Sequence, residues 1–178
     1  MFIPKILIVD DEESILSSLK RLFRKENYEV LTAKSGEEGF GILNQEEVNL
    51  IICDLKMPRM NGVEFLSQAK EKSPEALRIM LTGHADLKSV LDAIDRGEVY
   101  RFLLKPWNDD ELKLIIRQAL DYQQLRKENK ALTHTVKKQN QILQELERGF
   151  PGITDVKKDR DGAILLDVEG VTQKQEET

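Results

Sequence analysis

Five short apolar runs rich in β-branched residues recur along the first 105 residues, and they constrain the fold of this chain more than any other feature. They occupy residues Lys5–Asp10, Tyr28–Ala33, Val48–Asp54, Leu77–Thr82 and Tyr100–Lys105. Several are almost continuously apolar, which is typical of strands that are covered on both faces. The segments between them place apolar residues at helical spacing, as at Ile15, Leu19 and Leu22. This alternation predicts an α/β fold with a doubly wound, five-stranded parallel sheet.

Two of the expected helices carry a capping signal at their start. Ser35 is followed three residues later by Glu38, and Asn108 is followed in the same way by Glu111. A short polar side chain followed at this spacing by glutamate can satisfy main-chain N–H groups in the first turn. The pattern predicts that Ser35 and Asn108 are N-caps.

Size, charge and cysteine content exclude several classes of protein. The chain has 178 residues, a net charge of −5 and one cysteine, Cys53. This length suits one domain with an appendage. The negative charge gives no general attraction to nucleic acid or to an anionic membrane surface, and one cysteine excludes an internal disulfide and a cysteine-based zinc site. No stretch approaches the roughly 18 apolar residues of a membrane span, and no signal peptide is visible. We therefore expect a cytoplasmic protein.

A polar helical stretch replaces the apolar runs after about Asp121 and reaches about Arg148. It follows a seven-residue repeat, with Ile115, Tyr122, Asn129, Val136 and Leu143 at one position and Gln118, Leu125, Leu132, Gln139 and Leu146 at the other. This repeat predicts a coiled-coil helix over residues 122–148, continuing the last helix of a domain over residues 1–121. Asn129 at a core position favours a parallel homodimer in register. Docking of the helix onto the domain and pairing with a different protein are the alternatives.

Residues 149–178 form a tail. A turn signal at Asp159–Gly162, flanked by apolar residues, is compatible with a short hairpin, and residues Gln173–Thr178 are expected to be disordered. We expect no helix-turn-helix module in the heptad helix of residues 122–148 or in the tail that follows it. We therefore expect no direct binding to DNA.

Polar residues stand at the carboxyl ends of four of the five expected strands. They are Asp10 with Asp11, Asp54, Thr82 with Gly83, and Lys105 with Pro106. A parallel sheet of this kind brings such groups together at one edge. Three neighbouring carboxylates repel one another unless a cation intervenes, and Mg²⁺ prefers a few carboxylates with water and phosphate oxygens as its other ligands. A carboxylate beside such a cation can attack phosphorus, and an ammonium and a hydroxyl can stabilise the transferred phosphoryl group.

Taken together, Asp10-Asp11, Asp54, Thr82 and Lys105-Pro106 resemble the receiver domain of bacterial two-component response regulators. The local strings agree, with ILIVDDEES, DLKMPRMNG, LTGHA and YRFLLKPW at residues 6–14, 54–62, 81–85 and 100–107. The similarity covers roughly residues 5–121 and implies the flavodoxin-like receiver fold. It also implies that Asp54 is the phosphoacceptor, which receives a phosphoryl group from the phosphohistidine of a sensor histidine kinase.

The resemblance implies further roles around the acceptor. Asp11 and Asp54 would bind Mg²⁺ directly together with the backbone carbonyl of Lys56, and Asp10 would act through water. Thr82 and Lys105 would contact the phosphoryl oxygens. The Lys105–Pro106 peptide bond would be cis, and Pro58 and Gly62 would shape the turn that follows the acceptor.

The resemblance also implies a switch and a lifetime for the phosphorylated state. Phosphate on Asp54 would draw Thr82 inward, and Phe102 would rotate into the space that opens. The face formed by the fourth helix, the fifth strand and the fifth helix would then change. Lys56 and His84 lie two residues beyond Asp54 and Thr82, and we expect them to influence how fast the aspartyl phosphate hydrolyses.

We expect the output to be protein–protein contact, through altered dimerisation or a partner kinase, cyclase or phosphodiesterase. The protein would then not be an enzyme beyond its own phosphorylation and dephosphorylation. One rival is a phosphatase of the haloacid dehalogenase type, but its nucleophile lies on the first strand in an Asp-x-Asp pattern, whereas Asp10 is followed by Asp11 and Glu12. A flavin mononucleotide-binding module is a second rival, but it needs a loop rich in Gly, Ser and Thr where this chain has DDEES.

Overall fold

The computed structural model describes residues 3–83, 87–95 and 98–152, without the side chains of residues 87–90. The chain divides into two compact units, Met1–Lys127 and Glu128–Thr178, which we describe separately. The predicted hairpin and His84 lie outside the described residues. Among those residues, no helix has the length and apolar character needed to cross a bilayer.

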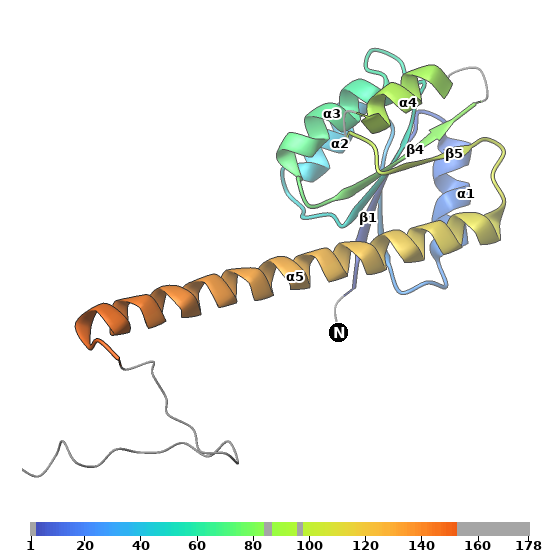
Figure 1. Cartoon of the computed structure of the whole chain (residues 1–178). Coiled ribbons are helices and arrows are strands. Elements are labelled where there is room, and N and C mark those ends of the chain that lie inside the picture. The colour runs from blue at the N-terminus through green and yellow to red at the C-terminus, as the bar shows by residue number, and fades with distance from the viewer. Residues whose placement is uncertain (1–2, 84–86, 96–97, 153–178) are drawn as a thin grey trace, which may run out of the picture. The chain divides into compact units, whose positions relative to one another are not determined.

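The first unit is built on a sheet of five parallel strands (Figure 1). The strands are β1 (Lys5–Val9), β2 (Glu29–Ala33), β3 (Leu50–Asp54), β4 (Leu77–Thr82) and β5 (Arg101–Leu104). Their order across the sheet is β2-β1-β3-β4-β5, and each pairs in parallel with its neighbours. The predicted strands are therefore confirmed, and β1 and β3 lie side by side as the expected site requires.

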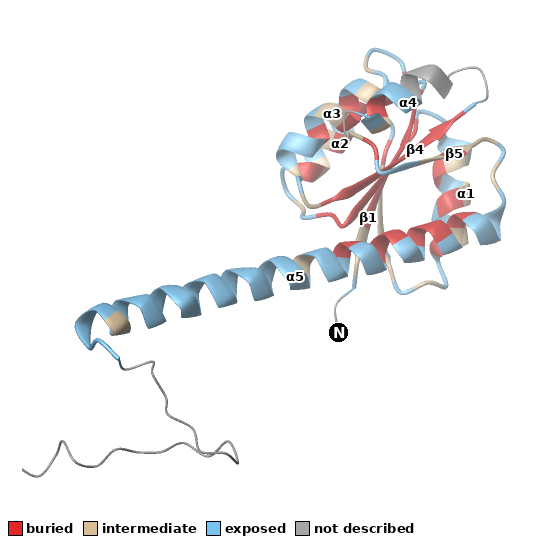
Figure 2. Ribbon diagram, in the orientation of Figure 1, coloured by how far each residue is buried: buried red, intermediate tan, exposed pale blue. Residues whose placement is uncertain are grey.

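Helices cover both faces of the sheet. They are α1 (Glu13–Phe23), α2 (Gly36–Leu43), α3 (Gly62–Lys72), α4 (Leu87–Asp95) and α5 (Asp109–Gly149). One hydrophobic cluster joins the strands to α1 and α5, and a second joins them to α2, α3 and α4. Successive residues of β1 alternate between the clusters, with Ile6 and Ile8 in the first and Leu7 and Val9 in the second. This explains why the runs are apolar without interruption, and Figure 2 shows the resulting burial.

Both capping predictions are confirmed. The Ser35 hydroxyl accepts a hydrogen bond from the Glu38 N–H at 3.2 Å. The Asn108 side chain accepts hydrogen bonds from the N–H groups of Asp110 and Glu111, at 2.9 and 3.1 Å. α5 then continues as one helix to Gly149, so a helix runs through the whole predicted coiled-coil segment.

The apolar residues of α5 serve two different purposes. Ile115 is buried in the first unit's core with Leu112 and Ile116, so it does not belong to an exposed heptad seam. From Tyr122 onward the apolar heptad residues are exposed, as at Leu125 and Leu132. The exposed part of the heptad seam therefore begins one heptad later than the sequence repeat does.

Candidate functional site

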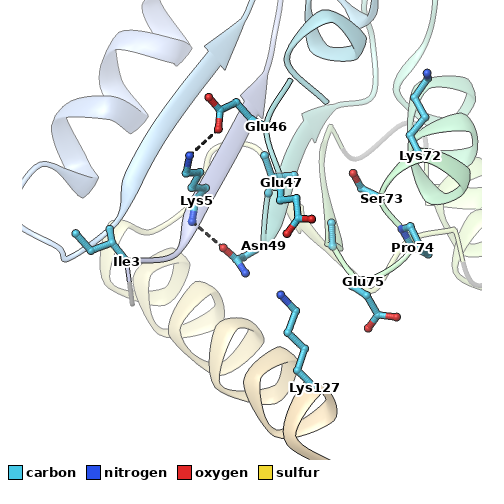
Figure 3. A pocket seen from close by; sticks show the side chains of 12 residues that line it. Ile3, Lys5, Glu46, Glu47, Asn49, Lys72, Ser73, Pro74, Glu75 and Lys127 are labelled. Atoms are coloured by element: carbon cyan, nitrogen blue, oxygen red, sulfur yellow. Dashed lines mark hydrogen bonds and ion pairs between the residues drawn. The ribbon is translucent and has the colours of Figure 1, made fainter. Parts of the chain in front are cut away.

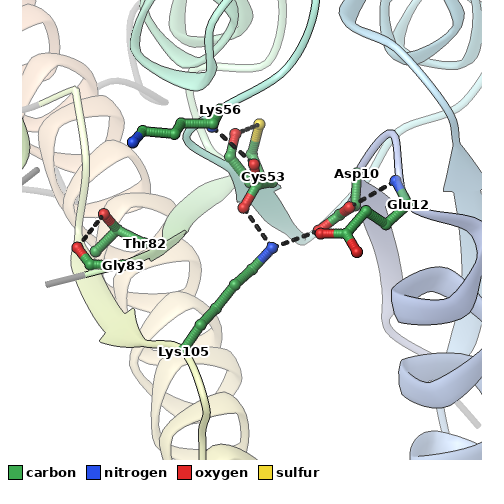
Figure 4. A network of polar contacts seen from close by, with 8 residues as sticks. Asp10, Glu12, Cys53, Lys56, Thr82, Gly83 and Lys105 are labelled. Atoms are coloured by element: carbon green, nitrogen blue, oxygen red, sulfur yellow. Dashed lines mark hydrogen bonds and ion pairs between the residues drawn. The ribbon is translucent and has the colours of Figure 1, made fainter. Parts of the chain in front are cut away.

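The carboxyl edge of the sheet brings together two carboxylates and one ammonium group. Asp10 follows β1, Asp54 ends β3 and Lys105 follows β5. The Lys105 Nζ atom lies 3.0 Å from Asp10 Oδ2 and 2.5 Å from Asp54 Oδ1. Figure 4 shows Lys105 extending between the two strand ends. The sheet order therefore places three residues that are far apart in sequence within hydrogen-bonding distance.

Main-chain groups hold the other carboxylate oxygens. The Glu12 N–H donates to Asp10 Oδ1 at 2.9 Å, and the Lys56 N–H donates to Asp54 Oδ2 at 2.7 Å. Asp10 is completely buried and Asp54 is 6% exposed. Each carboxylate is thus oriented by a backbone donor on one side and by Lys105 on the other. Sequence reasoning missed these two donors, because a main-chain N–H leaves no signal in residue identity.

Burial and charge act in opposite directions on the pKa values of this group. Burial raises the pKa of the Asp10 carboxyl above its ordinary value, although the Glu12 N–H and the Lys105 ammonium oppose the shift. Burial alone would lower the pKa of Lys105, but its hydrogen bonds and charge interactions with Asp54 and Asp10 outweigh burial and raise it. Lys105 is therefore a firmly protonated cation between two carboxylates.

The remaining predicted site residues lie in or next to strands β1, β4 and β5. The Asp11 side chain is exposed. Thr82 ends β4 and is buried, and its hydroxyl donates to the Gly83 carbonyl at 3.1 Å. Phe102 lies in β5, where it is partly buried and packs against the core cluster on the α2, α3 and α4 side. The Lys105–Pro106 peptide bond is cis.

The turn after Asp54 is folded tightly against the strand. The Gly62 N–H donates to the Leu55 carbonyl at 2.8 Å. A Cβ atom on Gly62 would overlap the Asp54 carbonyl oxygen and lie 2.9 Å from Leu55 Cα. The next helix begins here, with Asn61 and Glu64 forming a capping box. Only glycine fits where the turn approaches the end of β3 so closely. This close approach keeps the backbone of Asp54 in place.

The donor set at this edge suits Mg²⁺. Asp10, Asp11 and Asp54 contribute three negative charges and Lys105 one positive charge, which leaves a formal charge of −2 for a divalent cation to balance. All the candidate ligands are oxygens, which this hard cation prefers. Among the described residues, no three acidic, histidine or cysteine side chains form a ready-made metal cage. Mg²⁺ needs none, because it commonly uses one or two carboxylates with water and phosphate.

Comparison with known proteins gives a consistent result. Residues 6–117 match the response regulator receiver domain family. The hydrogenase transcriptional regulatory protein HoxA of Cupriavidus necator is 37% identical over 120 residues, which are 67% of this chain and 25% of HoxA. The chain spans about a quarter to a third of the length of these and other curated relatives that it matches.

Solved structures show the same fold over most of this chain. A response regulator receiver domain protein from Clostridium thermocellum is 35% identical with a TM-score of 0.65, covering 69% of this chain and 98% of that one. A protein described as adenylate cyclase from Rhodopirellula baltica is 33% identical with a TM-score of 0.71, covering 75% of this chain and 98% of that one. With a five-stranded parallel sheet, the expected strand ends and the family match in agreement, this chain belongs to the response regulator receiver domain family.

Proposed function

We propose that Asp54 accepts a phosphoryl group from the phosphohistidine of a histidine kinase, and that the chain signals this event through contacts with other proteins. The observation that carries the proposal is the Asp54 carboxylate, held between the Lys105 ammonium and the Lys56 N–H at the carboxyl edge of the sheet. This arrangement orients a nucleophile and places a fixed positive charge beside the position where phosphoryl oxygens would lie.

The proposed step is an in-line displacement at phosphorus. A carboxylate oxygen of Asp54 forms the new O–P bond, the N–P bond of the phosphohistidine breaks, and the imidazole nitrogen keeps the electron pair. The product is an aspartyl phosphate. Lys105 would stabilise the phosphoryl oxygens, and Asp10 keeps Lys105 in position through its 3.0 Å ion pair.

Asp11 and Asp54 would hold a magnesium ion directly, together with the backbone carbonyl of Lys56, and Asp10 would act on it through water. When bound, it supplies positive charge that neutralises the phosphoryl oxygens. The carboxylates of the chain would supply the negative charge that attracts this ion, and their fixed positions would orient it.

Thr82 and Phe102 form the proposed switch. They lie on the adjacent strands β4 and β5, where Thr82 pairs with Leu104 and Met80 pairs with Phe102. A phosphoryl group on Asp54 would offer the Thr82 hydroxyl an acceptor in place of the Gly83 carbonyl that it contacts here. Phe102 is partly buried and packs against the core cluster on the α2, α3 and α4 side, and it would rotate further inward when Thr82 moves.

The test is incubation of the whole chain with acetyl phosphate and magnesium, followed by intact mass measurement. One phosphoryl group adds about 80 Da. We expect one such addition with magnesium and none when a chelator removes the metal. A chain that never gains this mass with magnesium present would contradict the proposal, as would multiple turnover on a small phosphomonoester.

We further propose that the output involves a parallel homodimer through α5. Exposed apolar residues continue at heptad spacing along this helix, at Tyr122, Leu125, Leu132, Val136, Leu143 and Leu146. Leu132 is 66% exposed, and a polar helix with such a stripe gains most of its stability from packing against a partner. Asn129 falls within the stripe, where pairing of two asparagines favours a register-matched second copy of the same helix.

Replacing Leu132 with glutamate is expected to weaken this dimer by roughly a hundredfold or more, because it places two like charges face to face in an apolar seam. Light scattering at several concentrations measures the change. Ala131→Glu is the matched control, since Ala131 is exposed and lies one residue outside the seam. A monomeric wild-type chain, or a Leu132→Glu variant that stays dimeric, would contradict the proposed pairing.

A further inference from the structure

The inward face of α5 ends in a polar residue. Leu112, Ile116 and Ala119 face the core at helical spacing and are fully buried. Gln123 takes the next inward position and is 3% exposed. A buried glutamine is unusual, because its amide must find partners that replace water.

Gln123 finds its partners at the amino edge of the sheet, opposite the edge that carries Asp54. Its Oε1 atom accepts a hydrogen bond from Asn49 Nδ2 at 3.0 Å, and its Nε2 atom donates to the Glu75 carbonyl at 2.9 Å. Asn49 directly precedes β3, and Glu75 lies two residues before β4. One side chain of α5 is therefore bonded to the starts of two strands.

Asn49 extends this connection to a third strand. Its Oδ1 atom accepts from the Lys5 N–H at 2.9 Å, and its own N–H donates to the Lys5 carbonyl at 2.8 Å. Its carbonyl also accepts from the Leu77 N–H at 3.0 Å. Figure 3 shows the Lys5–Asn49 hydrogen bond beside α5, the helix that carries Lys127. The amide of Gln123 thus joins a network that spans β1, β3 and β4.

The neighbouring residue Tyr122 fixes a different side of the same helical turn. Its ring stacks on that of Tyr100, with centroids 5.5 Å apart and planes 16° from parallel. Tyr100 directly precedes β5, and its N–H donates to the Arg78 carbonyl. Gln123 and Tyr122 differ by about 100° around a helix with 3.6 residues per turn. Two contacts at this angle allow one rotational setting of α5.

We propose that Gln123 is the positioning residue that sets the rotation of α5 on the sheet, and so determines that Tyr122 and Leu125 stay available to a partner. The role of these residues as a partner surface rests on the proposed homodimer. The positioning itself rests on the described contacts alone. A polar side chain suits this purpose, because any other rotation would remove the acceptor that Gln123 offers to the buried Asn49 amide and the donor that it offers to the Glu75 carbonyl. Apolar contacts tolerate rotation of a helix more easily than hydrogen bonds do. A single buried polar residue is a recognised means of fixing how packed helices align.

The test is Gln123→Met, which keeps the approximate volume of the side chain and removes both hydrogen bonds. Hydrogen exchange of the amides of residues 119–126 is expected to accelerate roughly tenfold or more, because the last turns of α5 in the first unit lose their anchor. The amides of β3 and the phosphoryl mass gain on Asp54 are expected to stay unchanged. Gln124→Met is the matched control, since Gln124 is exposed on the same turn.

A second variant covers the case in which Gln123→Met does not fold. Gln123→Asn keeps the amide and shortens the side chain by one methylene group, so both hydrogen bonds are weakened without burying a charge, and its exchange is expected to be intermediate. Unchanged exchange over residues 119–126 would overturn the proposal. Equal acceleration in α5 and β3 would overturn it too, because Gln123 would then contribute only to global stability.

Cross-linking between two copies of the chain tests separately whether Gln123 controls the proposed partner surface. The native Cys53 is buried, so the thiol of a Leu125→Cys variant is the accessible one for oxidation across a dimer. Introducing Gln123→Met is expected to slow this cross-link several-fold, and an unchanged rate would overturn the link between positioning and the surface. If Leu125→Cys alone forms no cross-link and is monomeric by light scattering, the homodimer fails while the exchange measurement still decides the positioning role.

Discussion

Replacing Asp54 with asparagine is expected to abolish phosphoryl uptake completely. The amide has nearly the shape of the carboxylate and can still accept the hydrogen bond from the Lys56 N–H. It has no negatively charged oxygen to attack phosphorus, so the acyl phosphate does not form. Lys105 keeps its ion pair with Asp10, and the variant is expected to stay folded. Intact mass after treatment with acetyl phosphate and magnesium measures the loss.

The matched control for this variant is Asp121→Asn, which removes one exposed carboxylate on α5. It is expected to gain the phosphoryl mass to the same extent as the wild type. If the Asp54→Asn chain gains a phosphoryl group at the wild-type rate, Asp54 is not the acceptor. Far-ultraviolet circular dichroism of both variants separates lost chemistry from lost structure.

The Gly62→Ala substitution is expected to cost roughly 3 kcal/mol of unfolding free energy, because the added methyl group meets backbone and not a movable side chain. The atoms in its way are the Asp54 carbonyl and Leu55 Cα. Relief requires the turn to move away from β3, which also shifts the acceptor. We therefore expect slower phosphoryl uptake together with the lower stability. Urea unfolding measures the first effect and mass spectrometry the second.

Gly41→Ala provides a control with the opposite sign. Gly41 lies inside α2 and is exposed, and a Cβ atom there would have open space. Alanine in a helix interior is more stable than glycine by roughly 0.5–1 kcal/mol, so this variant is expected to gain stability. Equal effects of the two substitutions would show that the close approach at Gly62 does not constrain the turn.

The sequence predicts the parts of this molecule that repeat a simple pattern. Continuous apolar runs such as Leu50–Asp54 indicate strands covered on two faces, and the core clusters show those two faces. Asp10, Asp54 and Lys105 could be grouped in advance, because a parallel sheet collects the carboxyl ends of its strands at one edge. The physical rule is general, so it applies without knowledge of the side-chain contacts.

Other features depend on partners that sequence spacing does not reveal. Glutamine is typical of solvent-exposed helix positions, yet Gln123 is buried and bonded to Asn49, which lies 74 residues earlier in the chain. Ile115 fits the heptad repeat as well as Tyr122 does, but it is used by the core. Periodicity gives the angle of a residue around a helix, and the tertiary arrangement decides what covers that angle.

The central claim is that the carboxylate of Asp54 carries the phosphoryl group. The most direct measurement is tandem mass spectrometry of peptides from the acetyl phosphate-treated chain, with and without hydroxylamine, which cleaves acyl phosphates and leaves serine and threonine phosphates intact. We predict an addition of about 80 Da on the peptide segment that contains Asp54, lost after hydroxylamine treatment. An addition on Asp10, Asp11 or a hydroxyl residue, or one that survives hydroxylamine, would contradict the account.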